Sequence, residues 1–232
     1  MKKALVVLSG GQDSTTCLYW AKTQYDEIHA ITFDYGQRHD REIHAAGVIA
    51  IKAGVQSHVI VPVQDILESA SPLVSKTSEL ETYSDFDSMS EIIGDRIEKT
   101  FVPMRNAFFL TIAANRAIAL GCRTLVTGVC QEDNANYPDC RYSFITAQAY
   151  AINQALGIND FEIKTPLIYL SKAQSVELAM SLPGCMEALG NSHTCYAGEF
   201  PPCGKCHSCL LRAEGFKIAG MLDPLYNKAL AA

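Results

Sequence analysis

The sequence lacks an excess of positive charge, long apolar runs and internal repeats. Its 232 residues carry 19 Lys and Arg against 25 Asp and Glu, which gives a formal net charge of −6. Because broad contact with a nucleic-acid backbone needs a basic face, this balance argues against nucleic acid as a partner. The apolar run at residues 4–8 is too short for a membrane span or a signal peptide, so we expect a cytoplasmic protein without a membrane partner.

The glycine-rich stretch near the N-terminus lacks the lysine of the commonest phosphate loop. Residues 9–14 read Ser-Gly-Gly-Gln-Asp-Ser, after a predicted strand at 4–8 and before a predicted helix at 15–22. The G-x-x-x-x-G-K-[ST] pattern places a lysine on the phosphates, but no lysine follows Gly11 before Lys22. A glycine turn between strand and helix still aims backbone N–H groups at an anion. We therefore predict a phosphate site, completed by basic side chains from elsewhere, rather than an ordinary turn.

The rest of the chain alternates predicted strands and helices, which is typical of a doubly wound α/β fold. Further strands are predicted at residues 28–33, 57–63, 124–127 and 161–164. Helices are predicted at residues 41–53, 106–120, 141–156 and from Lys172 to before Pro183. We expect a mainly parallel five-stranded sheet with helices on both faces. Residues 68–99 lose this periodicity and are predicted to form a surface insertion or lid, with a short helix near residues 90–93.

Four of the nine cysteines are clustered, in the pattern C-x7-C-x2-C-x2-C. They are Cys195, Cys203, Cys206 and Cys209. Four thiolates can close a tetrahedral Zn²⁺ site, which would be structural because no coordination position stays open. An iron–sulfur cluster or a redox pair would also use such cysteines. We favour one structural zinc ion per chain, and we treat the five dispersed cysteines as core thiols.

These motifs together resemble the 7-cyano-7-deazaguanine (preQ0) synthase family of the queuosine pathway, within the PP-loop ATP pyrophosphatase superfamily. The resemblance rests on an ordered set of segments: residues 9–14, 33–39, 101–106, 127–130, 137–141, 165–167 and 194–196, with the three later cysteines. It implies an ATP-dependent ligase. The enzyme would convert 7-carboxy-7-deazaguanine and ammonia to 7-cyano-7-deazaguanine through adenylated intermediates. It also implies Mg²⁺ with ATP and a homodimer.

The resemblance implies a two-part organisation and a set of site residues. Residues 1–190 would form the PP-loop nucleotide-binding domain, with an insertion at about 68–100, and residues 191–232 a zinc-binding segment packed on it. The expected ATP-binding residues are Leu8, Ser9, Gly10, Gly11, Gln12, Asp13, Ser14, Thr15, Thr16, Cys17 and Leu18, with Asp13 helping to place Mg²⁺. The expected substrate-binding residues are Arg38, Asn106, Asp133, Tyr137 and Asp139, and a turn with capping acids is the alternative interpretation of residues 133–139.

Cations must neutralise the charge where a carboxylate attacks a phosphate, and we predict Arg105 and Lys164 in this catalytic role. For Lys164, a surface salt bridge is an equally good interpretation. The family usually has glycine where this chain has Met104. Since a side chain at positive φ costs about 1–2 kcal/mol, we expect Met104 to have ordinary φ or to alter the wall of the substrate site.

Three alternatives stay open at this level. A tRNA-modifying sulfur transferase would need a reactive thiol such as Cys130, and a basic face that the composition does not supply. An amidotransferase-type synthetase would need a glutaminase domain, so we expect free ammonia to be the nitrogen source. A non-catalytic module that binds nucleotide and zinc would show no ATP turnover.

Overall fold

The computed structural model describes residues 1–64, 66–75, 77–132 and 135–226. It contains a five-stranded sheet in the order β3-β2-β1-β4-β5, and every neighbouring pair is parallel. The strands are β1 (Lys3–Val7), β2 (Glu27–Asp34), β3 (Ser57–Pro62), β4 (Thr124–Val126) and β5 (Glu162–Lys164). The predicted parallel five-stranded sheet is confirmed.

Strand β1 lies at the centre of the sheet and is buried on both faces, as its continuous apolar run predicts. Leu5 pairs with His29 of β2 and with Leu125 of β4, and it is fully buried. Its neighbour Val6 is also fully buried but belongs to the core on the opposite face of the sheet. Successive side chains of a strand point to opposite faces, so one strand supplies both cores.

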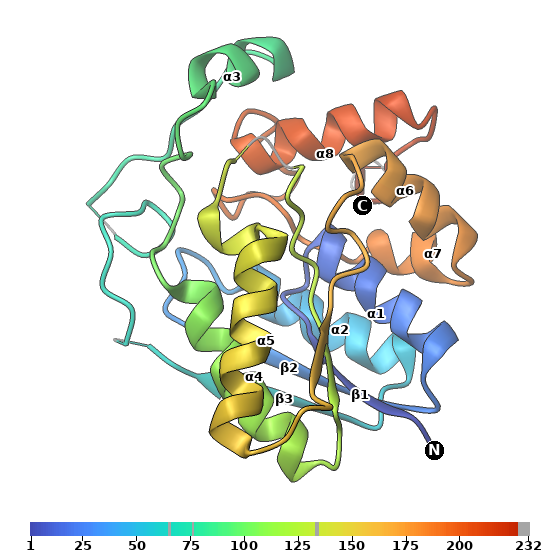
Figure 1. Ribbon diagram of the computed structural model, residues 1–232. Helices are drawn as coiled ribbons and strands as arrows, with labels where there is room; N and C mark the ends of the chain where they lie inside the picture. Colours follow the sequence, from blue (N-terminus) through green and yellow to red (C-terminus); the bar gives the residue numbers. More distant parts are fainter. Residues whose placement is uncertain (65, 76, 133–134, 227–232) are drawn as a thin grey trace.

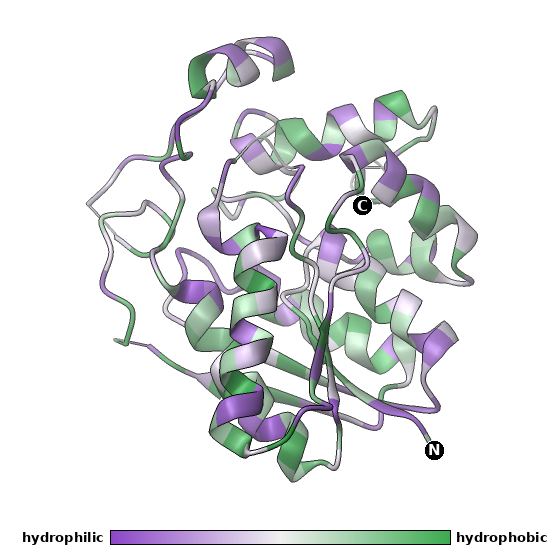
Figure 2. Ribbon diagram, viewed as in Figure 1, coloured by the Kyte–Doolittle hydropathy of each residue, from purple (hydrophilic) through white to green (hydrophobic). Residues whose placement is uncertain are grey.

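Four helices cover one face of the sheet, and two cover the other (Figure 1). The first group is α1 (Gln12–Gln24), α2 (Arg41–Ala53), α6 (Lys172–Ser181) and α7 (Cys185–Leu189). The second group is α4 (Arg105–Ala119) and α5 (Tyr142–Leu156). In Figure 2 the apolar residues of these helices alternate with polar ones along each ribbon, as expected for helices with one buried face. The doubly wound arrangement is confirmed.

Local signals in the sequence give several element boundaries correctly. Helix α2 spans the predicted residues and ends at Gly54, which has φ of 68°. Glycine is favoured there because the left-handed conformation has no steric cost without a Cβ. Ser171 and Gln174 form the predicted capping box at the start of α6, with the Ser171 hydroxyl accepting from the Gln174 backbone N–H.

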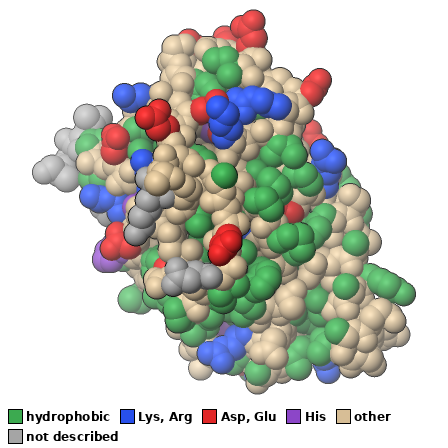
Figure 3. Space-filling model, turned by 90° about the vertical axis from the view of Figure 1, so that its left-hand side faces the viewer, with side chains coloured by type: hydrophobic (Ala, Val, Ile, Leu, Met, Phe, Trp, Pro, Cys, Tyr) green, Lys and Arg blue, Asp and Glu red, His purple; other side chains and the backbone are tan. Residues whose placement is uncertain are grey.

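The predicted insertion has mostly exposed or half-buried residues and a few buried ones. It contains α3 (Phe86–Ile93), which is longer than the predicted short helix and packs against α8 (His207–Ile218). Glu81 forms ion pairs with Arg96 at 2.7 Å and Lys99 at 2.8 Å, and Figure 3 shows charges of both signs side by side on the upper part of this face. The end of the insertion turns inward, since Glu98 is only 1% exposed.

Helix α8 begins directly after Cys206, contains Cys209 and packs mainly on α6. Arg212 of α8 is 2% exposed and donates two hydrogen bonds to the Asp223 carboxylate, at 2.6 and 2.8 Å. Its guanidinium also donates to the hydroxyl groups of Ser192 and Thr194, both at 2.8 Å. Arg212 thereby joins three separate stretches of the C-terminal region. Among the described helices, none has the length and apolar character needed to cross a membrane.

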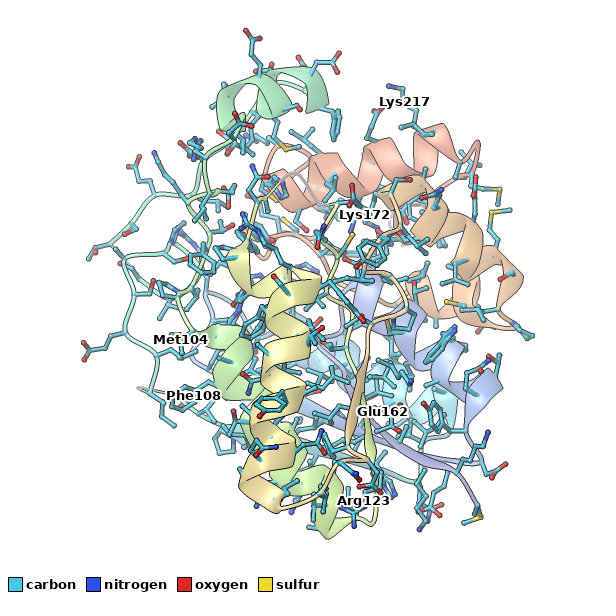
Figure 4. All side chains as sticks on the ribbon, in the orientation of Figure 1. Met104, Phe108, Arg123, Glu162, Lys172 and Lys217 are labelled. Atoms are coloured by element: carbon cyan, nitrogen blue, oxygen red, sulfur yellow. The ribbon has the colours of Figure 1, made fainter. Side chains whose placement is uncertain are left out.

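The expectation of an ordinary φ at Met104 is wrong. Met104 precedes α4 with φ of 64°, in the left-handed region, so its backbone is not ordinary. Its side chain is 64% exposed and is not among the residues that line the main cavity. Figure 4 shows it on the outer side of α4.

Candidate active site

A cavity of about 270 Å³ lies where β1, β2 and β4 end. The residues that line it come from the glycine loop, the turn after β2 with the start of α2, the start of α4 with the segment after β4, the start of α6, the insertion, and the C-terminal region around the cysteines. In open parallel sheets ligands bind beyond the carboxyl ends of the strands. The cavity is therefore where the fold predicts a ligand site.

The glycine loop has the conformation that its sequence predicts. Gly10 has φ of 87°, and a Cβ there would lie 2.2 Å from the carbonyl oxygen of Glu42. Only glycine therefore allows α2 to approach the loop this closely. The Ser9 and Ser14 hydroxyl oxygens are 2.9 Å apart, and the Ser9 N–H donates to Ser14 Oγ at 3.1 Å. These contacts fix the loop at the start of α1.

Six of the predicted ATP-binding residues line the cavity, and five do not. Those on the cavity wall are Leu8, Ser9, Gly11, Gln12, Asp13 and Ser14. The others are Gly10, which lies against α2, and Thr15, Thr16, Cys17 and Leu18, which are buried in the body of α1. No side chain caps α1 at Gly11. The helix terminus therefore keeps the anion-binding character expected of it.

Lys172 is a cavity residue that sequence analysis does not predict. Its ammonium donates to both carboxylate oxygens of Asp13, at 2.8 and 3.0 Å, across 159 positions of the sequence. The lysine side chain is 10% exposed and that of Asp13 26%. Gly215 of α8 allows the Lys172 side chain to lie against this helix, since a Cβ at position 215 would lie 2.5 Å from Lys172 Cγ. Figure 4 shows Lys172 close to α8. This lysine supplies the cation that the glycine loop lacks.

Arg105 and Asn106 start α4 and line the cavity from the opposite face of the sheet. The Arg105 guanidinium lies 5.8 Å from the centre of the Tyr35 ring. Burial opposes its charge, but nearby Tyr35, Tyr137, Tyr196 and Asp139 raise the pKa of Arg105, so it stays a cation. Arg105 is thus a fixed positive charge in the cavity wall.

Asp139 lies behind the cavity and not in its wall. Its carboxylate is 7% exposed and accepts from the Asn106 backbone N–H at 3.3 Å. Asn106 Nδ2 also donates to the Asp139 backbone carbonyl, at 3.2 Å. Burial raises the pKa of Asp139, although Arg105 opposes that shift. Asp139 therefore holds the first turn of α4, and with it Arg105, in place. This differs from the predicted direct contact with substrate.

Tyr137 lines the cavity, and its hydroxyl group is held by buried neighbours. The hydroxyl hydrogen-bonds to Thr100 Oγ1 and lies 3.3 Å from Glu98 Oε2. Glu98 also accepts from the Thr100 backbone N–H, at 2.7 Å. The insertion thus fixes the hydroxyl group of Tyr137 at the cavity wall.

The remaining predicted residues have different surroundings. Arg38 lines the cavity and donates to the backbone carbonyls of Pro72, at 3.5 Å, and Ser78, at 3.3 Å. Asp133 lies outside the described residues. The structure does not bring Lys164 to this cavity, because it ends the edge strand β5 and its ammonium pairs with Glu162 at 2.8 Å. The surface salt bridge is the interpretation that fits Lys164.

Glu42 is a second cavity residue that the sequence does not single out. It begins α2, next to the glycine loop. Burial raises the pKa of its carboxyl group to about 7, while Arg105 opposes the shift and Cys195 adds to it. In the sequence Glu42 is one of several polar residues in a predicted helix. Only its position in the fold marks it as a cavity residue.

The four clustered cysteines form a group that could hold a metal ion. Their sulfur atoms all lie within 4.8 Å of one another, and those of Cys203 and Cys209 are 3.9 Å apart. Four sulfur atoms at about 2.3 Å from a tetrahedral zinc ion would be separated by about 3.8 Å, so the cluster fits zinc. Backbone N–H groups of Cys203 and Cys206 donate to cluster sulfurs at 3.4 Å.

The cysteine cluster also braces one wall of the cavity. Three of its members are buried, and residues next to them line the cavity, namely Thr194, Tyr196, His207 and Ser208. The His193 backbone N–H donates to the Gly10 carbonyl at 2.9 Å, which ties this region directly to the glycine loop. Order in the cluster therefore determines order in the cavity wall.

Comparison with known proteins finds a matching family and close relatives in sequence. The family model described as queuosine biosynthesis protein QueC matches residues 3–220. Three curated relatives carry the name 7-cyano-7-deazaguanine synthase. The one from Gloeobacter violaceus is 45% identical over 98% of this chain and 97% of its own length. The one from Laribacter hongkongensis is 48% identical over 97% of this chain and 94% of its own length. The one from Chromobacterium violaceum is also 48% identical, over 99% of this chain and 95% of its own length.

Among solved structures, a 4-thiouridine synthetase in complex with RNA and with bound ATP has a TM-score of 0.48 and 16% identity, over 100% of this chain and 54% of that one. That identity is too low to bear on function. The family match and the relatives both extend over nearly the whole chain, including the glycine loop and the cysteine cluster. This chain belongs to the QueC family of queuosine biosynthesis proteins.

Proposed function

We propose that this protein is an ATP-dependent ligase that converts 7-carboxy-7-deazaguanine and ammonia into 7-cyano-7-deazaguanine. The observation that carries the proposal is the name shared by relatives 45–48% identical over nearly the full chain. The cavity supports it, because a phosphate loop, two fixed cations and an aromatic wall lie around one space. The same relatives do not favour a sulfur transferase or a non-catalytic module.

In the first step the substrate carboxylate attacks the α-phosphorus of ATP, pyrophosphate leaves, and an acyl adenylate forms. Both reactants are anionic, so fixed positive charges lower the barrier. Arg105 would bind the carboxylate, and Lys172, held by Asp13, would bind phosphate oxygens at the loop. In this proposal Lys172 replaces Lys164 as the second catalytic cation. Mg²⁺ would enter with ATP, and the Asp13 carboxylate on the loop would bind it.

In the second step ammonia attacks the acyl carbon, AMP leaves, and an amide forms after the nitrogen loses a proton. The amide oxygen then attacks the α-phosphorus of a second ATP, and pyrophosphate leaves again. Expulsion of AMP, with loss of both protons from the amide nitrogen, gives the nitrile. Both activations join an oxygen atom of the same substituent to the α-phosphorus of an ATP molecule. One cavity with fixed cations can therefore serve both.

We propose that the cysteine cluster binds one structural zinc ion. Four sulfur ligands leave no open position for substrate, so the ion would stabilise the fold without joining the reaction. Through the contact between His193 and Gly10, it would also stabilise the glycine loop.

A product assay tests the proposal. The protein is incubated with ATP, Mg²⁺, ammonia and 7-carboxy-7-deazaguanine, and the products are identified by mass spectrometry. We expect the nitrile together with two AMP and two pyrophosphate per substrate. The Asp13→Ala variant is the control and should form no AMP. ATP consumption that depends on a different carboxylate, with no nitrile from this one, would contradict the proposed substrate.

A further inference from the structure

His207 is a buried cavity residue whose polar atoms have no partner in the described part of the chain. It is the first residue of α8 and is 3% exposed. It lines the cavity, and neither Nδ1 nor Nε2 has a hydrogen-bond partner among the described residues. Nearly all buried polar groups in proteins are hydrogen-bonded, because leaving one unpaired is costly. The imidazole is therefore placed to bind something that enters the cavity.

Two other cavity residues have an unpartnered buried nitrogen, but their surroundings differ. Gln12 Nε2 belongs to the glycine loop and lies where the nucleotide phosphates are expected. His39 has one such atom, Nδ1, and its ring packs edge-on against His193 with centroids 4.9 Å apart. Among the described residues, His207 alone has two unpartnered ring nitrogens. In the sequence, His207 is far from the glycine loop at residues 9–14.

The charged neighbours of His207 place it in the cavity. Lys172 and Glu98 both act electrostatically on its ring. Lys172 pairs with Asp13 at the glycine loop, and Glu98 lies 3.3 Å from the Tyr137 hydroxyl oxygen. His207, Lys172 and Tyr137 line the same cavity. Because the hydroxyl of Tyr137 is occupied by Thr100 and Glu98, Tyr137 offers a ligand its aromatic ring rather than its hydroxyl group.

A deazaguanine ring matches these surroundings better than ATP. It is planar, so it can stack on an aromatic face, and its rim carries N–H donors and carbonyl and ring-nitrogen acceptors. The triphosphate of ATP is instead drawn to the loop, and its adenosine to the apolar strand ends at Leu8, Phe33 and Val129. On the basis of the proposed function, we propose that His207 hydrogen-bonds to the deazaguanine ring and selects this substrate.

Substitution of His207 tests the inference in steady-state kinetics with each substrate varied in turn. His207→Phe keeps a ring of similar size but removes both nitrogens. We expect the KM for 7-carboxy-7-deazaguanine to rise roughly tenfold to a hundredfold, with the KM for ATP within twofold of wild type. Asn and Gln side chains put an amide near the positions of Nδ1 and Nε2, so either His207→Asn or His207→Gln should recover most of the loss.

Two controls separate recognition from damage to the cysteine cluster. Lys205→Ala changes an exposed residue two positions before His207 and should leave both KM values unchanged. The zinc content of every variant is measured, and His207→Phe should match wild type. An unchanged KM for the deazaguanine in a zinc-loaded His207→Phe protein would overturn the inference, as would a loss confined to ATP. A wild-type protein that makes no nitrile would instead overturn the proposed function.

Discussion

At the scale of single residues, the Asp13–Lys172 pair is the centre of the site. Asp13 belongs to the glycine loop, and Lys172 begins α6 on the same face of the sheet. The carboxylate orients the ammonium while leaving it on the cavity wall. A helix terminus alone contributes roughly 0.3–2 kcal/mol to an anion, so tight binding of nucleotide phosphates needs such a cation.

Replacement of Lys172 by Met should lower kcat/KM for ATP about 10²- to 10³-fold, because a fixed charge at the phosphates is lost. The measurement is AMP release at varied ATP concentration. Lys217→Met is the matched control, since Lys217 is 75% exposed on α8, pairs with Glu214 and does not line the cavity. Equal activity of the two variants would remove Lys172 from the proposed mechanism.

Glu42 makes the stability of the protein depend on pH. Its folded-state pKa of about 7 lies above the ordinary value of 4.5, so folding favours the neutral acid. Its contribution to stability is greatest below about pH 4.5 and is lost as the pH rises through about 7. The Glu42→Gln variant should thus be more stable than wild type at pH 8, by about 1–3 kcal/mol, and the gain should shrink at pH 6.

Thermal unfolding of both zinc-loaded proteins between pH 6 and 8 provides the test. The opposite trend, with the variant gaining stability as the pH falls, would mean that Glu42 is stabilised as a carboxylate in the folded protein.

At the scale of elements, the start of α4 has a strained residue. Met104 is at φ of 64°, where a non-glycine residue costs about 1–2 kcal/mol. Met104→Gly should therefore raise Tm by about 2–4 °C, although the greater freedom of glycine in the unfolded chain offsets part of the gain. Because the side chain lies outside the cavity, substrate preference should not change. A changed KM for the deazaguanine would show that Met104 does contribute to the substrate site.

The contact between α6 and α8 depends on Gly215. A Cβ at this position would lie 2.5 Å from Lys172 Cγ and 3.1 Å from Lys172 Cβ, so one of the helices or the lysine must shift. Gly215→Ala should thus lower both Tm and ATP turnover. Gly47 of α2 is the matched control, because no atom lies within 4 Å of the position of its Cβ. Gly47→Ala should be stabilising by up to about 1 kcal/mol, with activity retained. Full activity in Gly215→Ala would mean that Lys172 tolerates displacement.

At the scale of the whole molecule, Arg212 holds the C-terminal region together, and His193 joins that region to the glycine loop. Arg212 is fully engaged by Asp223, Ser192 and Thr194, and His193 contacts the glycine loop. The four cysteines lie around one point between these contacts and the insertion, where the Tyr83 N–H donates to the Lys205 carbonyl at 2.9 Å. Loss of metal would therefore affect parts of the molecule far from the cluster.

Metal analysis should find about one zinc ion per chain, and its removal by a chelator should lower Tm and abolish ATP turnover together. Both should return when zinc is added back. The expected cause is loss of order in the wall that carries Tyr196 and His207. A metal-free protein with unchanged Tm would contradict a structural role for the cluster.

Features that depend on neighbours along the chain follow from the sequence alone. An apolar run, a glycine turn and a helix predict the phosphate loop, and a C-x2-C spacing brings thiolates together. The bounds of α2 and its left-handed end at Gly54 follow from helical periodicity and the freedom of glycine. The ordered set of short motifs was enough to identify the family.

The set of distant side chains that meet at the cavity depends instead on how the elements pack together. Lys172 and Asp13 are 159 positions apart, and the strand order β3-β2-β1-β4-β5 leaves Lys164 on an edge strand while α6 returns to the loop. Glu98 lies in a segment without periodicity and is nevertheless buried behind Tyr137. Sequence patterns report local conformation and burial of a face, whereas the convergence of charges depends on packing between elements, which no local pattern encodes.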